Sequence, residues 1–349
     1  MNHLNFRIEP LKKNRQHIYQ NIIGQKTKPP GSLGALETIA LQMATIQQAE
    51  KIIINRPTVI IYASDYGIAS EGVSAYPAEV TAQMVLNFLA GGAAINTFCR
   101  LNQLDLLIVD AGVDHDFEDV SGLIDRKIRK STTSFLHEPA MTEEECRRAI
   151  EAGAELVADQ KKNGSNIIGF GEMGIANTSS ASCIMHCITG ISLEKCVGRG
   201  TGLDDEQLEK KINILKLAIN NHGPMRATEP LKILQTFGGF ELAMMAGSFL
   251  KAAEQKMIIL VDGFIATAAF MVAARISEEV KDYAIFCHRS DEQGHKLMLD
   301  YLEATEILNL GLRLGEATGV AIAFPLIRAA AAFYNEMASF TEARVSEKH

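Results

Sequence analysis

The sequence predicts an α/β fold, a doubly wound and mostly parallel Rossmann-like sheet with a smaller all-α lobe. Short β-rich runs alternate with longer segments of helical spacing, which is typical of strand–helix–strand units. The β-rich runs are apolar throughout, as expected for strands that are buried on both faces of a parallel sheet. An acid or a glycine lies at or just after the end of each run, and in such sheets ligands bind beyond the carboxyl ends of the strands.

The elements follow one another in a regular order. We expect strands at 58–63, 106–110, 166–170 and 257–262, and helices at 78–100, 142–161, 205–221 and 238–255. Thr142 followed by Glu145 forms a capping box for the second of these helices. Residues 51–295 are expected to form the large α/β domain, and segments 1–50 and 296–349 the small helical lobe. Four residues are expected to gather beyond the strand ends: Asp65, Asp110, Gly171 and Asp262.

The composition argues against several classes of partner. The chain has 349 residues and a formal net charge of −8, without the clustered Lys and Arg of a nucleic-acid surface. Its N-terminus lacks the apolar core of a signal peptide, and its later apolar runs are interrupted by Asp262 or Arg328. We therefore expect a cytoplasmic enzyme with neither a nucleic-acid nor a membrane partner.

The six cysteines are scattered without paired spacing, which indicates reduced thiols. Cys183, His186 and Cys187 share one helical face, but a fourth ligand is missing and their neighbours are apolar. Core packing is the favoured interpretation, and no metal is expected.

Glu316 is the main candidate for a catalytic residue. It lies between Gly315 and Gly319 in apolar sequence, and no cation follows it until Arg328. Burial of an unpaired carboxylate raises its pKa toward neutrality, which suits a general base. The alternative is a solvated acid at a helix start, where the helix dipole favours negative charge.

Two glycine-rich segments are candidates for ligand binding. Residues 169–174 match the dinucleotide fingerprint GxGxxG, but 191–196, where an acid-ending strand is expected, shows no convincing strand. Residues 177–180 (NTSS) instead offer hydroxyls and free N–H groups at a helix N-terminus, which suit one phosphate. A second loop, 198–202 (GRGTG), precedes a helix with two lysines. Each loop alone is also compatible with an ordinary tight turn.

Six motifs together resemble the nicotinate-nucleotide:dimethylbenzimidazole phosphoribosyltransferase family. In order they are 28–34 (KPPGSLG), 71–74 (EGVS), 171–178 (GEMGIANT), 198–202 (GRGTG), 262–264 (DGF) and 314–316 (LGE). The resemblance implies transfer of the phosphoribosyl group of nicotinate mononucleotide to an aromatic base in cobamide (cobalamin-type) biosynthesis, with inversion at C1′ and without cofactor. It also implies a dimer, formed by the chain with itself or with a related chain. Segments 81–100 and 238–255 are candidate dimer surfaces, although burial against the sheet is the simpler account of both.

The resemblance also implies roles for individual residues. Glu316 matches the catalytic base, and Glu172 is the candidate that stabilises positive charge on the ribose. Ser290 is a candidate contact of the nicotinate carboxylate, or alternatively a helix N-cap. The residues expected to bind phosphate and ribose are Gly174, Asn177, Thr178, Ser179, Gly200, Thr201, Lys211, Asp262 and Gly263.

The sequence departs from the family where the acceptor base is expected. The usual Asp-His-Gly is replaced by 65–67 (DYG), and bulky side chains occupy the predicted acceptor pocket, which comprises Tyr76, Met84, Met173 and Leu314. We hypothesise a smaller phenolic acceptor, such as phenol or p-cresol, while neutral drift within an apolar pocket is the alternative. Two other functions stay open: a paralogous subunit that needs a partner chain, and an NAD-dependent oxidoreductase.

Overall fold

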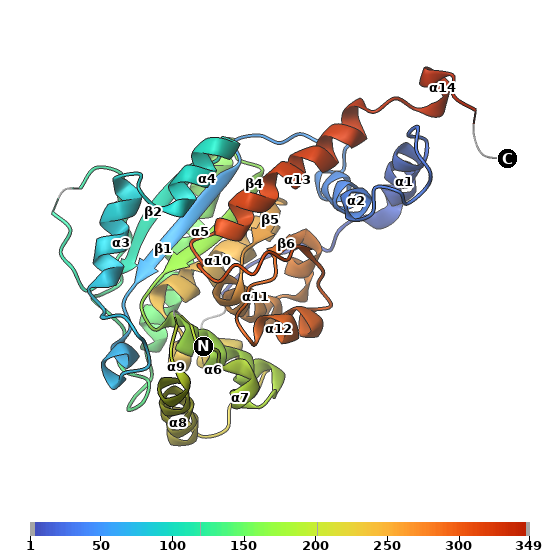
Figure 1. Cartoon of the computed structure of the whole chain (residues 1–349). Coiled ribbons are helices and arrows are strands. Elements are labelled where there is room, and N and C mark those ends of the chain that lie inside the picture. The colour runs from blue at the N-terminus through green and yellow to red at the C-terminus, as the bar shows by residue number, and fades with distance from the viewer. Residues whose placement is uncertain (1–3, 119, 201, 347–349) are drawn as a thin grey trace.

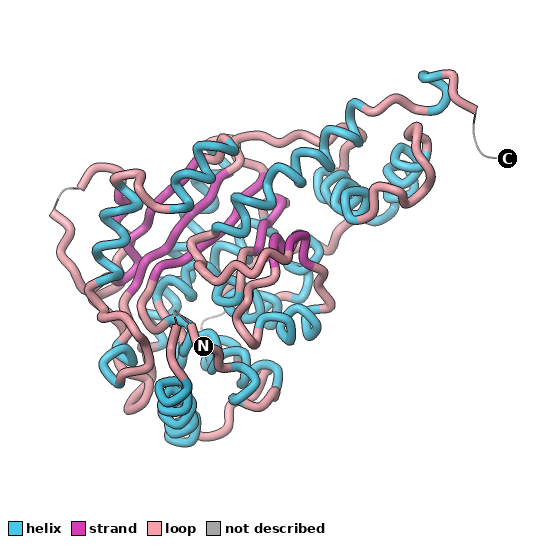
Figure 2. Tube along the Cα trace, in the orientation of Figure 1, coloured by secondary structure: helices cyan, strands magenta, loops and turns pink. Residues whose placement is uncertain are grey.

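Seven parallel strands form one sheet, which confirms the predicted fold class. The computed structural model describes residues 4–118, 120–200 and 202–346. The strand order is β3-β2-β1-β4-β5-β6-β7, with every pairing parallel, and Figure 2 shows the strands between helices. The strands are β1 (Thr58–Ser64), β2 (Asp105–Gly112), β3 (Leu123–Asp125), β4 (Ile167–Met173), β5 (Ile258–Val261), β6 (Ala284–His288) and β7 (Glu306–Leu308).

Helices connect the strands and cover both faces of the sheet. The α-helices are α1 (Gln16–Gly24), α2 (Ala35–Gln47), α3 (Val80–Leu89), α4 (Ala94–Asn102), α5 (Glu143–Lys162), α6 (Asn177–Thr189), α7 (Leu193–Cys196), α8 (Asp205–His222), α9 (Pro230–Phe237), α10 (Phe240–Glu254), α11 (Phe264–Ile276), α12 (His295–Leu302), α13 (Thr318–Glu336) and α14 (Phe340–Ala343). Three 3₁₀ helices are η1 (Lys13–Arg15), η2 (Gly67–Glu71) and η3 (Glu278–Tyr283).

The layers follow from the apolar faces of these helices. α3, α4 and α13 cover one face of the sheet, while α10 and α11 cover the other, with α5 packed outside α10 (Figure 1). α10 is buried along most of its length, because it lies between the sheet and α5. This burial explains its apolar sequence and removes it as a dimer surface.

The strand order reverses between β1 and β4, where the connections leave toward opposite edges of the sheet. In doubly wound folds a crevice opens at this point, beyond the carboxyl ends of the strands. β1 is buried at all seven positions, and its end is in register with the end of β4, where Tyr62 pairs with Glu172. The fold therefore places Glu172 beside the crevice.

The prediction of one helix at 78–100 was wrong in its length. The segment forms α3 and α4, and the chain turns between them at Gly91, whose φ is +77°. By length and composition alone Val80–Asn102 is apolar enough to cross a membrane. The two helices have 10 and 9 residues, and each is shorter than the roughly 20 residues of a membrane-spanning helix.

The two terminal segments lie side by side. Lys26 and Ser339 form an isolated antiparallel bridge, and the amide of Thr27 donates to the carbonyl of Ala338 at 3.1 Å. α2 packs against α13, and α1 packs against α2 (Figure 1). Segment 296–349, however, also contributes β7 to the sheet edge. The division into 51–295 and a terminal lobe stays a proposal.

Candidate active site

A pocket opens beyond the carboxyl ends of β4, β5 and β6. Many of the residues expected to bind the donor or acceptor meet there, although they come from separate segments of the chain. Its walls are formed by Glu172, Met173, Gly174, Ile175, Asn177, Thr178, Gly200, Asp262, Gly263, Phe264, Ile265, Ala266, His288, Ser290, Glu292, Arg313, Leu314 and Gly315. The helix N-termini of α6 and α11 contribute to the wall, and both favour bound anions.

Glu316 follows the pocket residue Gly315 and precedes α13. It is 4% exposed, so the alternative of a solvated acid is wrong. Within the described part of the chain, its Oε2 atom is buried without a hydrogen-bond partner. Burial, and after it the charge of Asp262, raises the pKa of Glu316 to about 7. A carboxylate with this pKa is suited to accept a proton near neutral pH.

The backbone at this acid is in an uncommon conformation. Glu316 and Ala317 both have left-handed backbones, with φ of +60° and +57°. For residues other than glycine this conformation costs on the order of 1 kcal/mol or more, and such strain is concentrated at functional sites. Gly315 has φ of +80°, and a Cβ at this position would collide with Oε1 of Glu172. The glycine beside Glu316 thus allows two acids to approach each other.

Two glycines of the apparent dinucleotide fingerprint allow close packing against a strand and do not form a phosphate-binding turn. Gly169 and Gly171 lie inside β4, and a Cβ on Gly171 would lie 2.7 Å from both the carbonyl carbon of Glu316 and Cβ of Ala317. After α6 the chain continues into α7 and α8, and the next strand, β5, begins only at Ile258. The strand that a dinucleotide site requires is therefore not at the expected place, which argues against the NAD-dependent oxidoreductase.

Glu172 is the last residue but one of β4, and its carboxyl group lies against Gly315. It is buried, and its Oε2 atom accepts a hydrogen bond from Nδ2 of Asn177, the first residue of α6. Burial raises the pKa of Glu172 to about 8, and the charges of Asp262 and Glu316 add to this rise. Three acids therefore share one buried region.

The expected phosphate cradle is built around Thr178 and Lys211. Lys211 is 1% exposed, and its Nζ atom donates to Oγ1 of Thr178 at 2.9 Å and to the Gly198 carbonyl at 3.5 Å. Burial lowers the pKa of Lys211 to about 8. Arg313 donates to the carbonyl of Gly200 at 3.2 Å from the other side. Two cations thus hold one glycine loop.

Not every residue expected in the cradle lines the pocket. Gly174, Asn177, Thr178, Gly200, Asp262 and Gly263 do. Ser179 is fully buried outside the pocket wall, and Lys211 lies behind the pocket residues Thr178 and Gly200. Thr201 lies outside the described residues. The roles of all these residues stay predictions.

Ser290 lines the pocket, and its backbone amide donates to Nδ1 of His295 at 2.7 Å. α12 begins at His295 with Gly294 as its N-cap, so the alternative that Ser290 caps this helix is wrong. Asp262 follows β5, and its Oδ1 atom accepts from the amide of Val320 at 3.1 Å. This bond ties the pocket to the first turn of α13.

The residues of the predicted acceptor pocket are only partly brought together. Met173 and Leu314 line the pocket. Tyr76 is 52% exposed before α3, and Met84 packs partly buried against the core, outside the pocket wall. Tyr66, which stands in place of the usual histidine, is buried and donates its hydroxyl to Glu241 Oε1.

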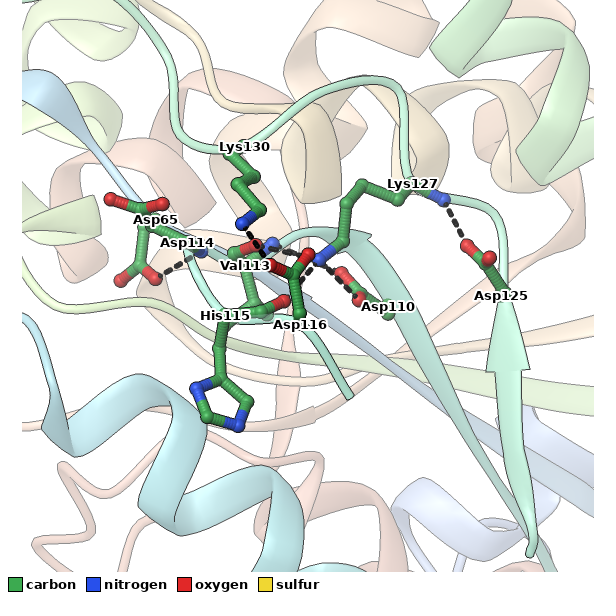
Figure 3. Close-up of polar contacts among 9 residues, drawn as sticks. All are labelled: Asp65, Asp110, Val113, Asp114, His115, Asp116, Asp125, Lys127 and Lys130. Carbon is green, nitrogen blue, oxygen red and sulfur yellow. Dashed lines mark hydrogen bonds and ion pairs between the residues drawn. The ribbon is translucent and has the colours of Figure 1, made fainter. Parts of the chain in front are cut away.

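Beyond β1, β2 and β3 the same edge of the sheet is occupied by internal ion pairs (Figure 3). Oδ2 of Asp65 accepts from the amide of Asp114 at 2.8 Å, and Oδ2 of Asp110 pairs with Lys127 at 3.0 Å. Neither Asp65 nor Asp110 lines the pocket of Asp262, so the prediction that they join it at a ligand crevice was wrong, although all three lie at this edge. The pocket belongs to the half of the sheet that starts at β4.

Sequence reasoning assigned no role to several pocket residues, chiefly His288, Arg313 and Glu292, although Glu292 belongs to the loop 290–295, which resembles a family motif near the nicotinate. Arg313 lies only three residues before Glu316, and this closeness in sequence could have predicted that Arg313 is near the pocket. His288 ends β6, a strand that the sequence reading did not predict. Glu292 lies against the distant Gly198, where a Cβ would be 3.0 Å from its Cδ, and this contact has no signal in the sequence.

Comparisons with known proteins agree along nearly the whole chain. Residues 8–345 match a family model described as "Phosphoribosyltransferase". The chain is 53% identical over 339 residues to a nicotinate-nucleotide–dimethylbenzimidazole phosphoribosyltransferase of Cupriavidus taiwanensis, covering 97% of both chains. It is 51% identical over 338 residues to one of Photobacterium profundum, covering 97% of this chain and 98% of the relative.

Solved structures give the same result. The crystal structure of CobT from Thermus thermophilus superposes with a TM-score of 0.91 at 39% identity, covering 95% of this chain and 99% of that one. Matches of this length and identity are sufficient to assign the family. The chain therefore belongs to the nicotinate-nucleotide:dimethylbenzimidazole phosphoribosyltransferase family and is a phosphoribosyltransferase.

Proposed function

We propose that this enzyme transfers the phosphoribosyl group of nicotinate mononucleotide to an aromatic base. The products are nicotinate and an α-riboside phosphate for cobamide biosynthesis. The observation that carries the proposal is Glu316, an unpartnered buried carboxylate on left-handed backbone next to the pocket. The names of the relatives, which specify nicotinate nucleotide and dimethylbenzimidazole, support the choice of donor and acceptor.

In this proposal the donor lies across the pocket from α6 to β6. Its phosphate binds at the N-terminus of α6 near Thr178, Gly200 and Lys211, where a helix dipole and a buried cation favour an anion. The ribose lies over Asp262 and Gly263, and nicotinate is near Ser290. Fixing the phosphate holds C1′ in place for attack, which reduces the entropic part of the barrier.

The chemistry fits the buried acids. The bond between C1′ and the pyridinium nitrogen breaks with its electron pair moving to nicotinate, and positive charge develops on the ribose. In its ionised form, which predominates above its pKa of about 8, Glu172 stabilises this charge. Because the charge appears only during reaction, the stabilisation acts on the transition state. The acceptor attacks C1′ from the opposite face and gives its proton to Glu316, so the β anomer becomes α.

The direct test is turnover by the purified chain. Nicotinate mononucleotide and dimethylbenzimidazole are incubated with the enzyme, and nicotinate and the riboside phosphate are measured by chromatography and mass spectrometry. Glu316→Gln is expected to abolish turnover while retaining donor binding. Glu336→Gln, which changes an exposed acid at the end of α13, is the matched control with unchanged turnover. Full turnover by Glu316→Gln would refute the assignment of the base.

We further propose that the acceptor class includes phenols such as phenol and p-cresol. Met173 and Leu314 give the pocket an apolar wall, and Met adapts to ligands of different shape. A phenol has a pKa near 10, so its deprotonation places a greater demand on Glu316 than that of a ring nitrogen. Competition between dimethylbenzimidazole and phenol, followed by mass spectrometry, decides the question. Exclusive use of dimethylbenzimidazole contradicts the phenolic acceptor.

We also propose a dimer, with a second copy or with a related chain. Leu86 and Leu101, on α3 and α4, are 43% and 74% exposed, and apolar side chains of this size are expected at an interface. Light scattering on the purified chain measures the mass directly. If the chain is monomeric and binds donor without turnover, the alternative of a subunit that needs a related partner is favoured.

A further inference from the structure

His288 is a buried pocket residue to which the proposed mechanism gives no role. It ends β6 and is 2% exposed. Its ring is held between two glycines, because a Cβ on Gly319 would lie 2.6 Å from its Cγ and a Cβ on Gly263 would lie 2.9 Å from its Nε2. In the described chain neither ring nitrogen has a hydrogen-bond partner of good geometry. Buried polar atoms of this kind require an explanation.

The acid that pairs with this ring is Asp262. Nε2 of His288 and Oδ1 of Asp262 are 3.5 Å apart, a distance at which an imidazolium and a carboxylate form an ion pair. The same Oδ1 accepts from the amide of Val320 in the first turn of α13. Asp262 also precedes α11, and both helix N-termini favour its negative charge.

Asp262 is in turn the common neighbour of the two reactive acids. Its charge adds to burial in raising the pKa of Glu316 and of Glu172. An imidazolium beside Asp262 offsets this charge, whereas a neutral imidazole does not. The charge on His288 therefore influences how readily Glu316 ionises.

We propose that Asp262 and His288 form a charge couple that sets the protonation state of Glu316. This inference rests on the proposed role of Glu316 as the base. His288 is then a positioning residue, which acts through Asp262 and not on the substrate. A protonated His288 allows Glu316 to ionise at lower pH, and the exchange of His288 for a neutral side chain leaves the charge of Asp262 uncompensated.

The other groups around the couple are consistent with this role. His288 faces Asp262, His295 on α12 and the neighbouring Arg289. Burial lowers the pKa of His295 to about 3, so His295 is neutral and accepts the Ser290 amide through Nδ1. Burial also opposes protonation of His288, but the contact with Asp262 outweighs it, and the pKa of His288 is raised.

Around Glu316 the facing charges are Asp262 and, across Gly315, Glu172. The first turns of α11 and α13, residues 264–267 and 318–321, carry no titratable side chain and contribute only their helix dipoles. Asp262 is thus the group through which a change at His288 reaches Glu316.

The test is the pH dependence of a single turnover, with enzyme in excess over nicotinate mononucleotide and with saturating dimethylbenzimidazole, measured as nicotinate release. Asp262→Asn keeps an oxygen acceptor for the Val320 amide but removes the charge, so the acid limb is expected to move to lower pH by about one unit. His288→Gln is expected to move the limb to higher pH by about half a unit to one unit. A residue that only fills space would not give shifts of opposite sign. His17→Gln, on the exposed face of α1, is the control with an unchanged profile.

The outcomes separate this inference from the proposed function. Shifts of equal sign, or no shift in either variant, overturn the charge couple. If His288→Gln does not fold, Asp262→Asn decides alone, and a limb that stays in place or moves to higher pH overturns it. If Glu316→Gln abolishes turnover while neither variant moves the acid limb of the pH profile, the role of Glu316 as the base is supported and the charge couple is refuted. Turnover retained by Glu316→Gln overturns the base and the couple together.

Discussion

Replacing Gly171 by alanine tests whether this strand glycine positions Glu316, the proposed base. The new Cβ would lie closest to the amide nitrogen of Ala317 and 2.7 Å from the carbonyl carbon of Glu316. Ordinary contact begins at 3.4 Å, so one side must recede by at least about 0.7 Å. β4 cannot recede easily, because Gly171 pairs with Ile61 of the buried central strand β1. The segment at Glu316 and Ala317 must move instead.

The expected effect is larger on catalysis than on stability. Overpacking of this kind costs about 1–3 kcal/mol of unfolding free energy. A displacement of the base on the order of 1 Å costs about 10²-fold in the rate of the chemical step. Single-turnover nicotinate release and thermal unfolding measure the two effects separately, and donor binding by calorimetry is expected to change little.

Two other glycines provide the comparison. A Cβ on Gly169 would lie 2.6 Å from Cγ1 of Val320, which is a side-chain atom, so Gly169→Ala is expected to lower stability without displacing Glu316. Gly24 has no atom within 4 Å of the added Cβ, and Gly24→Ala is expected to be silent. If Gly171→Ala turns over at the rate of Gly24→Ala, the idea that Gly171 positions the base is refuted.

Three further variants address charge and burial. Glu316→Gln is expected to raise Tm at about pH 8 but much less at about pH 5. A carboxyl group whose pKa rises from 4.5 to about 7 on folding costs stability as the pH increases between these values, up to about 3 kcal/mol. Calorimetry at both pH values checks this prediction, and an equal change in Tm at the two contradicts it. Lys211→Met removes a buried cation beside Thr178. The variant is expected to raise KM for nicotinate mononucleotide roughly 10- to 100-fold with little change in kcat. A selective loss of kcat in steady-state kinetics contradicts a binding role for Lys211. Tyr66→Phe leaves buried Glu241 without the hydroxyl that donates to it. The free energy of unfolding, measured by chemical denaturation, is expected to fall by about 1–3 kcal/mol. A variant as stable as the parent chain contradicts the importance of this hydrogen bond.

The predicted parts of the fold are those with a long local signal. Strands β1, β2, β4 and β5 are runs of buried apolar residues, and the capping box of α5 forms as predicted, with Thr142 and Glu145 bonding each other's amides. β3 and β7 have three residues each and are partly exposed, which is too short for a periodic pattern. Helical spacing also continues across Gly91, and a lone glycine in such a pattern does not by itself specify a break.

The rule for doubly wound sheets applies to each strand end separately, and Asp262, which was predicted at the crevice by this rule, lines the pocket. Glu172, which also lines it, was predicted from the family resemblance. The same rule failed for Asp110, since it does not say which half of the sheet holds the ligand, and Lys127 neutralises this acid. His288 and Glu292 were missed because their neighbours lie far away in the sequence.

Glu316 shows why local sequence leaves two interpretations of such an acid open. A solvated helix start and a buried base have the same residues nearby, and the difference in pKa arises from burial and from Asp262, which is 54 residues away. Burial in turn requires Gly171 on β4 to admit the backbone of residues 316 and 317. A glycine inside a buried strand, opposite the start of a helix, is therefore the sequence feature that distinguishes a buried carboxylate from a solvated one.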